Sequence, residues 1–118
     1  MYESLNDAAE AFNLITLSKG RTQVWYQRPE FYGDIRFGDV KVDPQDLEKT
    51  HIKLGEIHEK DPETIWQLLQ AHNWSPESEA YDLIRRKGLR HTSMDVGDVV
   101  ATTEGVFMVA ACGFKKLA

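Results

Sequence analysis

The stretch HTSMDVGDVV, residues 91–100, carries the densest set of chemically active side chains in this chain. His91 and Ser93 stand two residues apart, so an extended backbone places both on one face, where the imidazole can serve as a base toward the hydroxyl. Nucleophilic catalysis also requires an orienting group and oxyanion donors, and the stretch lacks the glycine-flanked serine of a nucleophile elbow. The pattern therefore favours a binding loop or a structural turn over a catalytic serine.

The same stretch suits a tight turn. Gly97 can adopt a positive φ, and Asp98 can accept hydrogen bonds from nearby backbone N–H groups. Thr92 and Ser93 can cap neighbouring backbone groups in a similar way. We expect the turn to lead into a final β-hairpin. His91 is the first candidate for a ligand contact, because it is a titratable group beside a constrained loop.

A basic run precedes this loop. Its cations are Arg85, Arg86, Lys87 and Arg90. They can bind a phosphate or an acidic partner, but they also fall at the end of an expected helix, where cations offset the helix dipole and pair with free carbonyls. No aromatic residue is interleaved with them, as happens in segments that bind single-stranded nucleic acid. The run therefore favours a helix-ending role, with ligand binding as the alternative.

Two histidines and three glutamates in the middle of the chain resemble the ingredients of a metal site. His51 and His58 are seven residues apart, so a single helix would place them two turns apart, too far to share an ion. The nearby acids are Glu48, Glu56 and Glu59. The chain has neither the zincin spacing of two histidines nor a Cys-x-x-Cys pair. We predict no metal site and no cofactor.

Five aromatic residues lie close together in the first half of the chain. They are Trp25, Tyr26, Phe31, Tyr32 and Phe37. Side chains alternate across a strand, so some of the five become exposed if the opposite face is core. We expect most of them to belong to the core; the alternative is an exposed interaction surface that includes Trp25 and Tyr26.

The composition is that of one folded domain spanning residues 1–118. Hydrophobic residues make up 42% of the chain and charged residues 28%, which is normal for a globular protein. No apolar run reaches the roughly 20 residues that cross a bilayer, and the N-terminus lacks the features of a secretory signal. The single Cys112 cannot form an internal disulfide. Its apolar neighbours predict a buried thiol in a reducing, cytoplasmic setting.

The net charge of −5 is concentrated in one segment. Residues 43–63 carry seven acids and three bases, whereas 1–42 carry six and five, and 64–118 carry six of each. This balance argues against binding of a phosphate backbone by the molecule as a whole. The interleaved lysines favour a solvated surface over a mimic of nucleic acid.

Proline pairs predict three helix starts, because proline fits the first helical position after a good N-cap residue. The pairs are Asp43-Pro44, Asp61-Pro62 and Ser75-Pro76. We expect a short first helix, a second over 62–72 and a third over 76–87 that ends at Gly88. Asn6 can cap one more helix near the N-terminus.

Strands are predicted on both sides of these helices. Residues 22–28 are rich in β-branched and aromatic types, and 34–42 alternate with a slip at Gly38 that suggests a bulge. Glu104-Gly105 predicts a tight hairpin, with glycine in the left-handed position of a type I turn. The run HIKLGEI, 51–57, fits no single period. The order predicts an α+β fold: a small antiparallel sheet with about three or four helices on one side and a C-terminal β-hairpin.

Three segments stand out as a set: HTSMDVGDVV (91–100), VFMVAACGFKKL (106–117) and VDPQDLE (42–48). Together they resemble a family of small proteins, or domains of larger polyvalent proteins, encoded by phages, plasmids and integrated elements and related to YodL-like domains. Asp95 departs from the pattern, because serine is common at that position. The resemblance implies a phage or mobile-element accessory protein and supplies no catalytic residues to transfer.

The leading hypothesis is a non-enzymatic accessory protein of phage or mobile-element type that binds a host or phage protein in the cytoplasm of the bacterial host, with a possible antidefence or host-takeover role. The alternative is a nucleic-acid-binding module that uses the basic segment 85–91 together with Lys115, Lys116 and the 91–98 loop. A third hypothesis, an enzyme using His91 and Ser93, requires a pocket lined by both residues. Neither main hypothesis involves a membrane.

Overall fold

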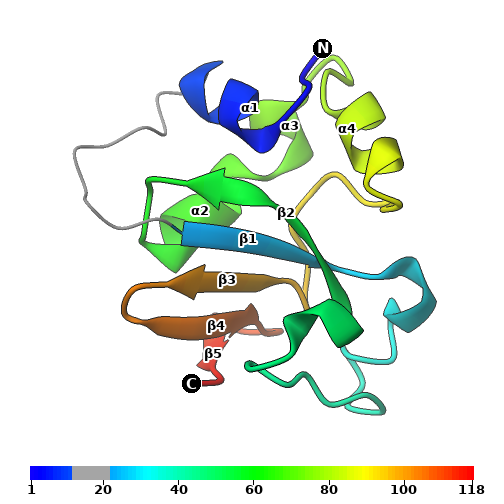
Figure 1. Ribbon diagram of the computed structural model, residues 1–118, viewed down its shortest axis with the longest axis vertical. Coiled ribbons are helices and arrows are strands. Elements are labelled where there is room, and N and C mark those ends of the chain that lie inside the picture. The colour runs from blue at the N-terminus through cyan, green and yellow to red at the C-terminus, as the bar shows by residue number, and fades with distance from the viewer. Residues whose placement is uncertain (12–21) are drawn as a thin grey trace.

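A five-stranded antiparallel sheet organises the molecule, and the computed structural model describes residues 1–11 and 22–118. The strand order is β2-β1-β3-β4-β5, with every neighbouring pair antiparallel (Figure 1). The strands are β1 (Thr22–Gln27), β2 (His51–Ile57), β3 (Val99–Thr102), β4 (Gly105–Val109) and β5 (Phe114–Lys116). Together with the helices below, this sheet confirms the predicted α+β class.

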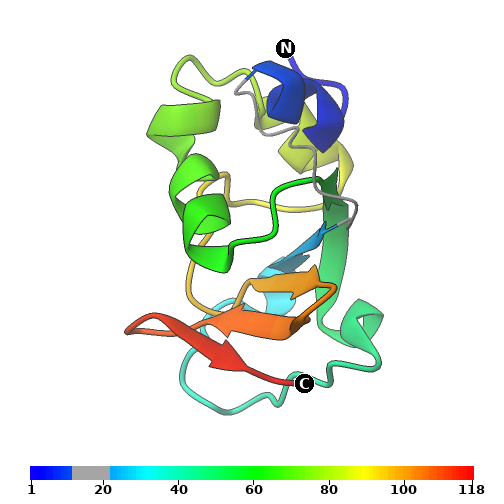
Figure 2. The same cartoon turned by 90° about the vertical axis from the view of Figure 1, so that its left-hand side faces the viewer.

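Four short α-helices pack on one face of the sheet. They are α1 (Leu5–Ala11), α2 (Pro62–Leu68), α3 (Ala71–Trp74) and α4 (Tyr81–Arg86). In Figure 2 the helices occupy the upper part of the view, and β4 and β5 lie below them. Two 3₁₀ turns, Pro29–Phe31 and Leu47–Lys49, lie in the long connection between β1 and β2. None of the helices in the described part of the chain is long and apolar enough to cross a membrane.

The main core lies between this helical layer and the sheet. Trp74 is fully buried there, and its ring stacks on Tyr2 with ring centroids 6.3 Å apart. The backbone of β2 touches α1 directly: a Cβ placed on Gly55 would come within 2.8 Å of the Cβ of Leu5. A smaller cluster covers the opposite face of the sheet, where Trp25 packs with Leu47 and Val99. The sheet is therefore covered on both faces near its centre.

Local capping explains where two of the helices begin. Ser4, and not the predicted Asn6, caps α1: its hydroxyl accepts from the Asp7 nitrogen, and the Asp7 carboxylate accepts from the Ser4 nitrogen in return. Asp61 caps α2 as predicted, with its carboxylate accepting from the Thr64 nitrogen at 3.2 Å. A reciprocal cap near the N-terminus leaves Asn6 inside the helix.

The helix predicted after Asp43-Pro44 does not form. The Asp43 carboxylate accepts from the Gln45 nitrogen, which closes a local turn, and only the 3₁₀ turn at Leu47–Lys49 follows. A cap specifies the first turn alone, and a helix continues only when it has an apolar face to bury. In this segment Leu47 is the one buried residue between 43 and 49.

The other two predicted helices are shorter than expected. The helix over 62–72 breaks after Leu68, and α3 starts at Ala71. The helix over 76–87 begins only at Tyr81, because Ser78 adopts a φ of 65° and interrupts helical geometry. Its end at Gly88 is as predicted.

The end of α4 is a Schellman motif. Gly88 has a φ of 77°, the Gly88 nitrogen donates to the Arg85 carbonyl, and the Leu89 nitrogen donates to the Ile84 carbonyl. Leu89 and Ile84 are both buried, which supplies the hydrophobic contact that accompanies this motif. The motif turns the chain sharply into residues 90–98.

The prediction of a strand over residues 34–42 is wrong. Gly33 and Gly38 have φ values of 99° and 82°, and the segment folds into successive turns in which the Phe37 nitrogen donates to the Gly33 carbonyl. Of the two apolar residues that suggested alternation, Ile35 is buried, while Phe37 is 77% exposed. Glycine supplied turn geometry here rather than a bulge.

The ambiguous run 51–57 is strand β2. Its register against β1 shifts between Val24 and Trp25, so the residues facing the core no longer alternate strictly. His51, Leu54 and Ile57 are the buried positions, three residues apart. Val24 pairs with Gly55 and Trp25 with Lys53, so Leu54 is an extra residue in β2, and this bulge produced a spacing that resembles neither a regular strand nor a helix.

The C-terminal hairpin forms one residue earlier than predicted. Thr102 pairs with Gly105, so the connecting residues are Thr103 and Glu104, and Gly105 starts β4 with a φ of 150°. After β4 the chain turns at residues 110–113 and adds β5 as an edge strand. This last strand carries the partly buried Phe114 against the main core, as expected for the closing segment.

Candidate functional site

Asp98 is a buried carboxylate at the centre of the 91–98 loop. Its Oδ1 accepts from the backbone nitrogen and the side-chain amide of Gln27, at 2.8 and 3.2 Å. Its Oδ2 accepts from the Asp95 nitrogen and from Nε2 of His91, both at 2.8 Å. Asp98 has no exposed surface. It therefore accepts local backbone hydrogen bonds, as predicted, and also joins the loop to β1.

A buried histidine supports the same loop from β2. Nε2 of His51 lies 2.7 Å from the Gly97 carbonyl, and its Nδ1 lies 2.7 Å from the hydroxyl of Thr50. A carbonyl can only accept, so Nε2 carries the proton and Nδ1 accepts from Thr50. Burial lowers the pKa of His51, which keeps the ring neutral. His51 is thus a structural support for the turn.

His91 is held in a fixed orientation between two tyrosines. Its ring stacks on Tyr26 at a centroid distance of 4.5 Å and meets Tyr32 edge-on at 5.1 Å. Nδ1 is buried and makes no hydrogen bond to any residue that the structure describes. The hydrogen bond between Nε2 and Asp98 orients the ring, and the buried Nδ1 is withdrawn from the surface.

Ser93 and His91 engage different partners. The Ser93 hydroxyl accepts from the Ala71 nitrogen at 2.8 Å, which satisfies a free N–H at the start of α3. The Thr92 carbonyl accepts from the Tyr26 hydroxyl and from the indole of Trp74. Ser93 and Thr92 therefore cap and anchor neighbouring elements: the Ser93 hydroxyl lies against α3, whereas Nε2 of His91 lies against Asp98.

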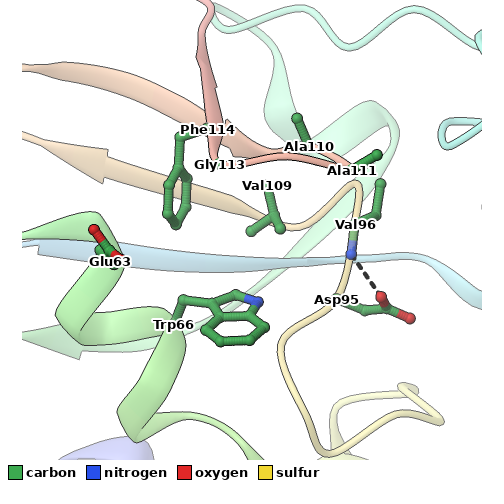
Figure 3. A pocket seen from close by; sticks show the side chains of 9 residues that line it. All are labelled: Glu63, Trp66, Asp95, Val96, Val109, Ala110, Ala111, Gly113 and Phe114. Atoms are coloured by element: carbon green, nitrogen blue, oxygen red, sulfur yellow. Dashed lines mark hydrogen bonds between the residues drawn. The ribbon is translucent and has the colours of Figure 1, made fainter.

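An apolar cleft opens between α2 and the loop that joins β4 to β5 (Figure 3). Trp66 and Phe114 face each other across it, with Val109 between them, while Glu63 lies at one end and Asp95 at the other. The cleft has a volume of about 350 Å³. The residues that line it are Glu63, Trp66, Asp95, Val96, Val109, Ala110, Ala111, Gly113 and Phe114.

The two acids of this cleft differ in their hydrogen bonding. Asp95 is held in place: one oxygen accepts from the Val96 nitrogen and the other from the hydroxyl of Tyr32. Burial and the hydrogen bond to Asp95 raise the pKa of Tyr32 to about 12. Glu63 makes no hydrogen bond or ion pair with the residues that the structure describes. Its carboxylate is therefore available to a ligand.

Arg90 lies between two further hollows on another part of the surface. One, of about 320 Å³, is lined by Pro29, Tyr32, Arg90 and His91. The other, of equal volume, is lined by Tyr81, Ile84, Arg85, Gly88, Leu89, Arg90 and Thr92. Of the predicted basic residues, Arg85 and Arg90 line these hollows. Arg86 instead donates to the carbonyls of Tyr2 and Glu3.

The predicted aromatic patch is divided. Trp25 and Tyr26 are buried, so neither lies on an exposed binding surface. Burial, with the charge of Asp98 as a smaller contribution, raises the pKa of Tyr26 well above its usual value. Tyr32 and Phe37 are exposed. Tyr32, in the turn after β1, is therefore a better candidate for a surface contact than Trp25 or Tyr26.

Cys112 is exposed, which corrects the prediction of a buried thiol. The apolar run around it ends in the turn between β4 and β5 rather than in a strand. As for metals, no three His, Cys, Asp or Glu side chains within residues 1–11 and 22–118 are grouped so that they can hold an ion.

Sequence reasoning missed the cleft residues. Glu63 and Trp66 are three residues apart on a helix, so they share a face, and an acid beside an aromatic residue was the available signal. Phe114 reaches the cleft only through pairing of β5 with β4, which no local pattern encodes. Comparisons with protein-family models, curated proteins and solved structures found no match to this chain.

Proposed function

We propose that this protein is a non-enzymatic accessory protein of phage or mobile-element type that binds a host or phage protein through the cleft between α2 and the β4–β5 turn. The observation that carries the proposal is the pair Trp66 and Phe114, which face each other across an apolar hollow with a carboxylate at either end. The proposed place of action is the cytoplasm of the bacterial host. A lone exposed thiol at Cys112 fits such a reducing compartment.

The cleft has the properties of a side-chain binding site. Its walls are mainly apolar, and its volume of about 350 Å³ is at the lower end of the range for ligand pockets. Trp66 is 37% exposed although it is a large aromatic residue, and aromatic residues of this kind are enriched among interface hot spots. An apolar side chain of the partner, inserted between Trp66 and Phe114, would remove this surface from water.

The charges of the cleft specify a basic neighbour for that apolar side chain. Glu63 precedes Trp66 by three residues on α2, so a cation near the Glu63 carboxylate also lies close to the indole face. The proposed partner segment therefore has a central apolar residue and an adjacent lysine or arginine. The resemblance of residues 91–100 to phage and mobile-element proteins supports a host or phage protein as the source of that segment.

A labelled thiol provides a direct test on a defined probe. An environment-sensitive fluorophore is attached to Cys112, which lies in the turn beside the cleft. A short synthetic peptide with a central leucine and a flanking lysine is titrated against the labelled protein, and so is the same peptide with glutamate in place of lysine. We expect saturable binding of the lysine peptide and roughly tenfold weaker binding of the glutamate peptide, which corresponds to about 1.4 kcal/mol.

The variants Glu63→Lys and Trp66→Ala are expected to weaken binding of the lysine peptide. Glu104→Lys is the matched control, because it makes the same charge change in the hairpin turn at the opposite end of β4. The same three variants, immobilised, are then compared for capture of proteins from lysate of infected host cells. If Glu63→Lys and Glu104→Lys affect binding equally, or if neither peptide binds the unmodified protein, the proposal is wrong.

A further inference from the structure

Two hollows of equal size share a single arginine at the end of α4. Arg90 lines both the hollow that contains Tyr32 and the hollow that contains Tyr81, each of about 320 Å³. The Schellman motif at Gly88 turns the chain so that Arg90 follows α4 directly and precedes the fixed ring of His91. The two hollows therefore adjoin at one cation, Arg90.

Each hollow contains an exposed tyrosine. The side chain of Tyr81 is 53% exposed and that of Tyr32 is 46% exposed. The guanidinium of Arg85 lies over the Tyr81 ring, 5.5 Å from its centroid. The Tyr32 ring is held in place by its hydroxyl, which donates to Asp95. Both rings are therefore positioned in advance as platforms for stacking.

The arginine between the platforms is free to bind an anion. Arg90 makes no side-chain hydrogen bond or ion pair within the described part of the chain, whereas Arg86 is occupied by two carbonyls of the N-terminal segment. The negative charge of the molecule is concentrated in residues 43–63 rather than here. Asp82 on α4 and Asp95, which is hydrogen-bonded to Tyr32, are among the acids near this surface, so binding is expected to be moderate and sensitive to salt.

We infer that this second surface binds single-stranded nucleic acid, with a backbone phosphate at Arg90 and one base in each hollow, stacked on Tyr32 and on Tyr81. The surface is called the Arg90 surface below; it consists of Tyr32, Tyr81, Arg85 and Arg90. Alternation of a ring, a cation and a ring matches the base–phosphate–base repeat of a single strand. An acidic peptide would supply a negative charge for Arg90 but no ring to stack on Tyr32 or Tyr81.

The aromatic residues that were absent from the basic run in the sequence are thus supplied by the fold. Tyr81 lies one helical turn before Arg85, and Tyr32 comes from the connection between β1 and β2. Lys115 and Lys116 do not take part, because β5 lies at the lower left of Figure 1 and α4 at the upper right. The inference does not depend on the cleft beside α2, which lies on different residues.

Fluorescence anisotropy tests the inference on the intact protein. The probe is fluorescein-labelled oligothymidylate of about 12 nucleotides, within the site sizes of known single-strand binders. We expect Tyr81→Ala to weaken binding by at least roughly fivefold, the lower limit for loss of one stacking platform. Arg90→Gln is expected to weaken binding and to reduce the slope of log K against log salt by about 0.7, the value for one phosphate contact on a single strand.

Three comparisons complete the test. Lys115→Gln removes one positive charge from β5 and is expected to leave the affinity unchanged, and so is Glu63→Gln in the cleft. Failure of the unmodified protein to bind the oligonucleotide at about 50 mM salt would overturn the inference. If Arg90→Gln and Lys115→Gln lowered the affinity for the oligonucleotide equally, the inference would also be overturned, because equal effects would indicate diffuse charge attraction. Displacement of the oligonucleotide by an equimolar acidic peptide would assign the surface to acidic proteins instead.

Discussion

The Oδ1 atom of Asp98 accepts a hydrogen bond at 2.8 Å from the backbone nitrogen of Gln27, a residue 71 positions earlier in the chain. Pairing of β1 with β3 extends only from Gln23 to Trp25 on the β1 side. At Gln27 a side-chain carboxylate therefore takes the place of a strand carbonyl. This contact joins β1 to the loop that carries His91, beyond the last paired residues of β1 and β3.

The first prediction concerns this carboxylate. Asp98→Asn replaces an acceptor of four hydrogen bonds by an amide whose NH₂ group must face at least one donor. We expect the free energy of unfolding to fall by about 2–4 kcal/mol, the cost of disrupting a buried charged network. Urea denaturation measures it. Asp39→Asn, the same change at an exposed position, is the control and is expected to shift stability by less than about 0.5 kcal/mol.

The second prediction concerns the glycine of the same turn. Gly97 has a φ of 100°, and a Cβ at this position would lie 2.7 Å from Oε1 of Gln27. Gly97→Ala combines backbone strain with a steric clash, so we expect a loss of about 2–4 kcal/mol in unfolding free energy. Gly38→Ala separates the two causes, because Gly38 has a φ of 82° but no atom within 4 Å of the added Cβ. Equal losses in the two variants would show that the contact with Gln27 is unimportant.

The third prediction is a pH dependence that originates at His51. Burial lowers the pKa of His51 below its ordinary value of 6.5, so below about pH 6.5 the unfolded chain binds a proton that the folded protein does not. Stability contributed by the neutral ring is therefore complete at higher pH and is lost as the pH falls below 6.5.

Two measurements check this dependence. In an NMR titration, the ring protons of His51 are expected to titrate below 6.5, and a midpoint at or above that value would contradict the assignment. In urea denaturation, the stability lost between about pH 7.5 and about pH 5.5 is expected to be smaller in His51→Gln than in the unmodified protein. Glutamine keeps one N–H donor for the Gly97 carbonyl and has no titrating group.

The fourth prediction assigns Ser93 a structural role. Its hydroxyl accepts from the Ala71 nitrogen at the start of α3, where the preceding Gln70 provides no side-chain cap. Ser93→Ala is expected to reduce the unfolding free energy by about 1–2 kcal/mol, as loss of a helix cap does. Thr103→Ala, in the exposed hairpin turn, is the matched loss of a hydroxyl and is expected to be neutral. A serine-directed covalent probe that labels Ser93 in the folded protein would argue for the catalytic hypothesis instead.

The sequence predicted the elements that local chemistry controls. Asp61-Pro62 starts a helix because Ile65 and Leu69 follow on a face that the core can bury, and Gly88 ends one because its positive φ completes a Schellman motif. The same cap-and-proline signal failed at Asp43-Pro44, where no such apolar face follows. A local signal thus starts an element, and the tertiary core decides whether it continues.

The candidate site was only partly predictable for the same reason. The position and turn chemistry of Gly97 and Asp98 could be read from residue types, because glycine conformation and carboxylate capping are local properties. The cleft needed the pairing of β5 with β4 to bring Phe114 opposite Trp66, 48 positions apart in the numbering. Exposure also follows the tertiary fold: Tyr26 is buried while Tyr32, in the next turn, is exposed.

The connection between β1 and β2 leaves the sheet and returns to it at one point. Gln27 pairs with His51, and the Arg28 nitrogen donates to the Thr50 carbonyl at 2.8 Å, so the two ends of the segment 28–50 are fastened side by side. Such a segment can be lengthened, shortened or exchanged without changing the register of the sheet. Tyr32 belongs to this segment. Replacing residues 28–50 by another loop would therefore change recognition at the Arg90 surface and leave the sheet as it is.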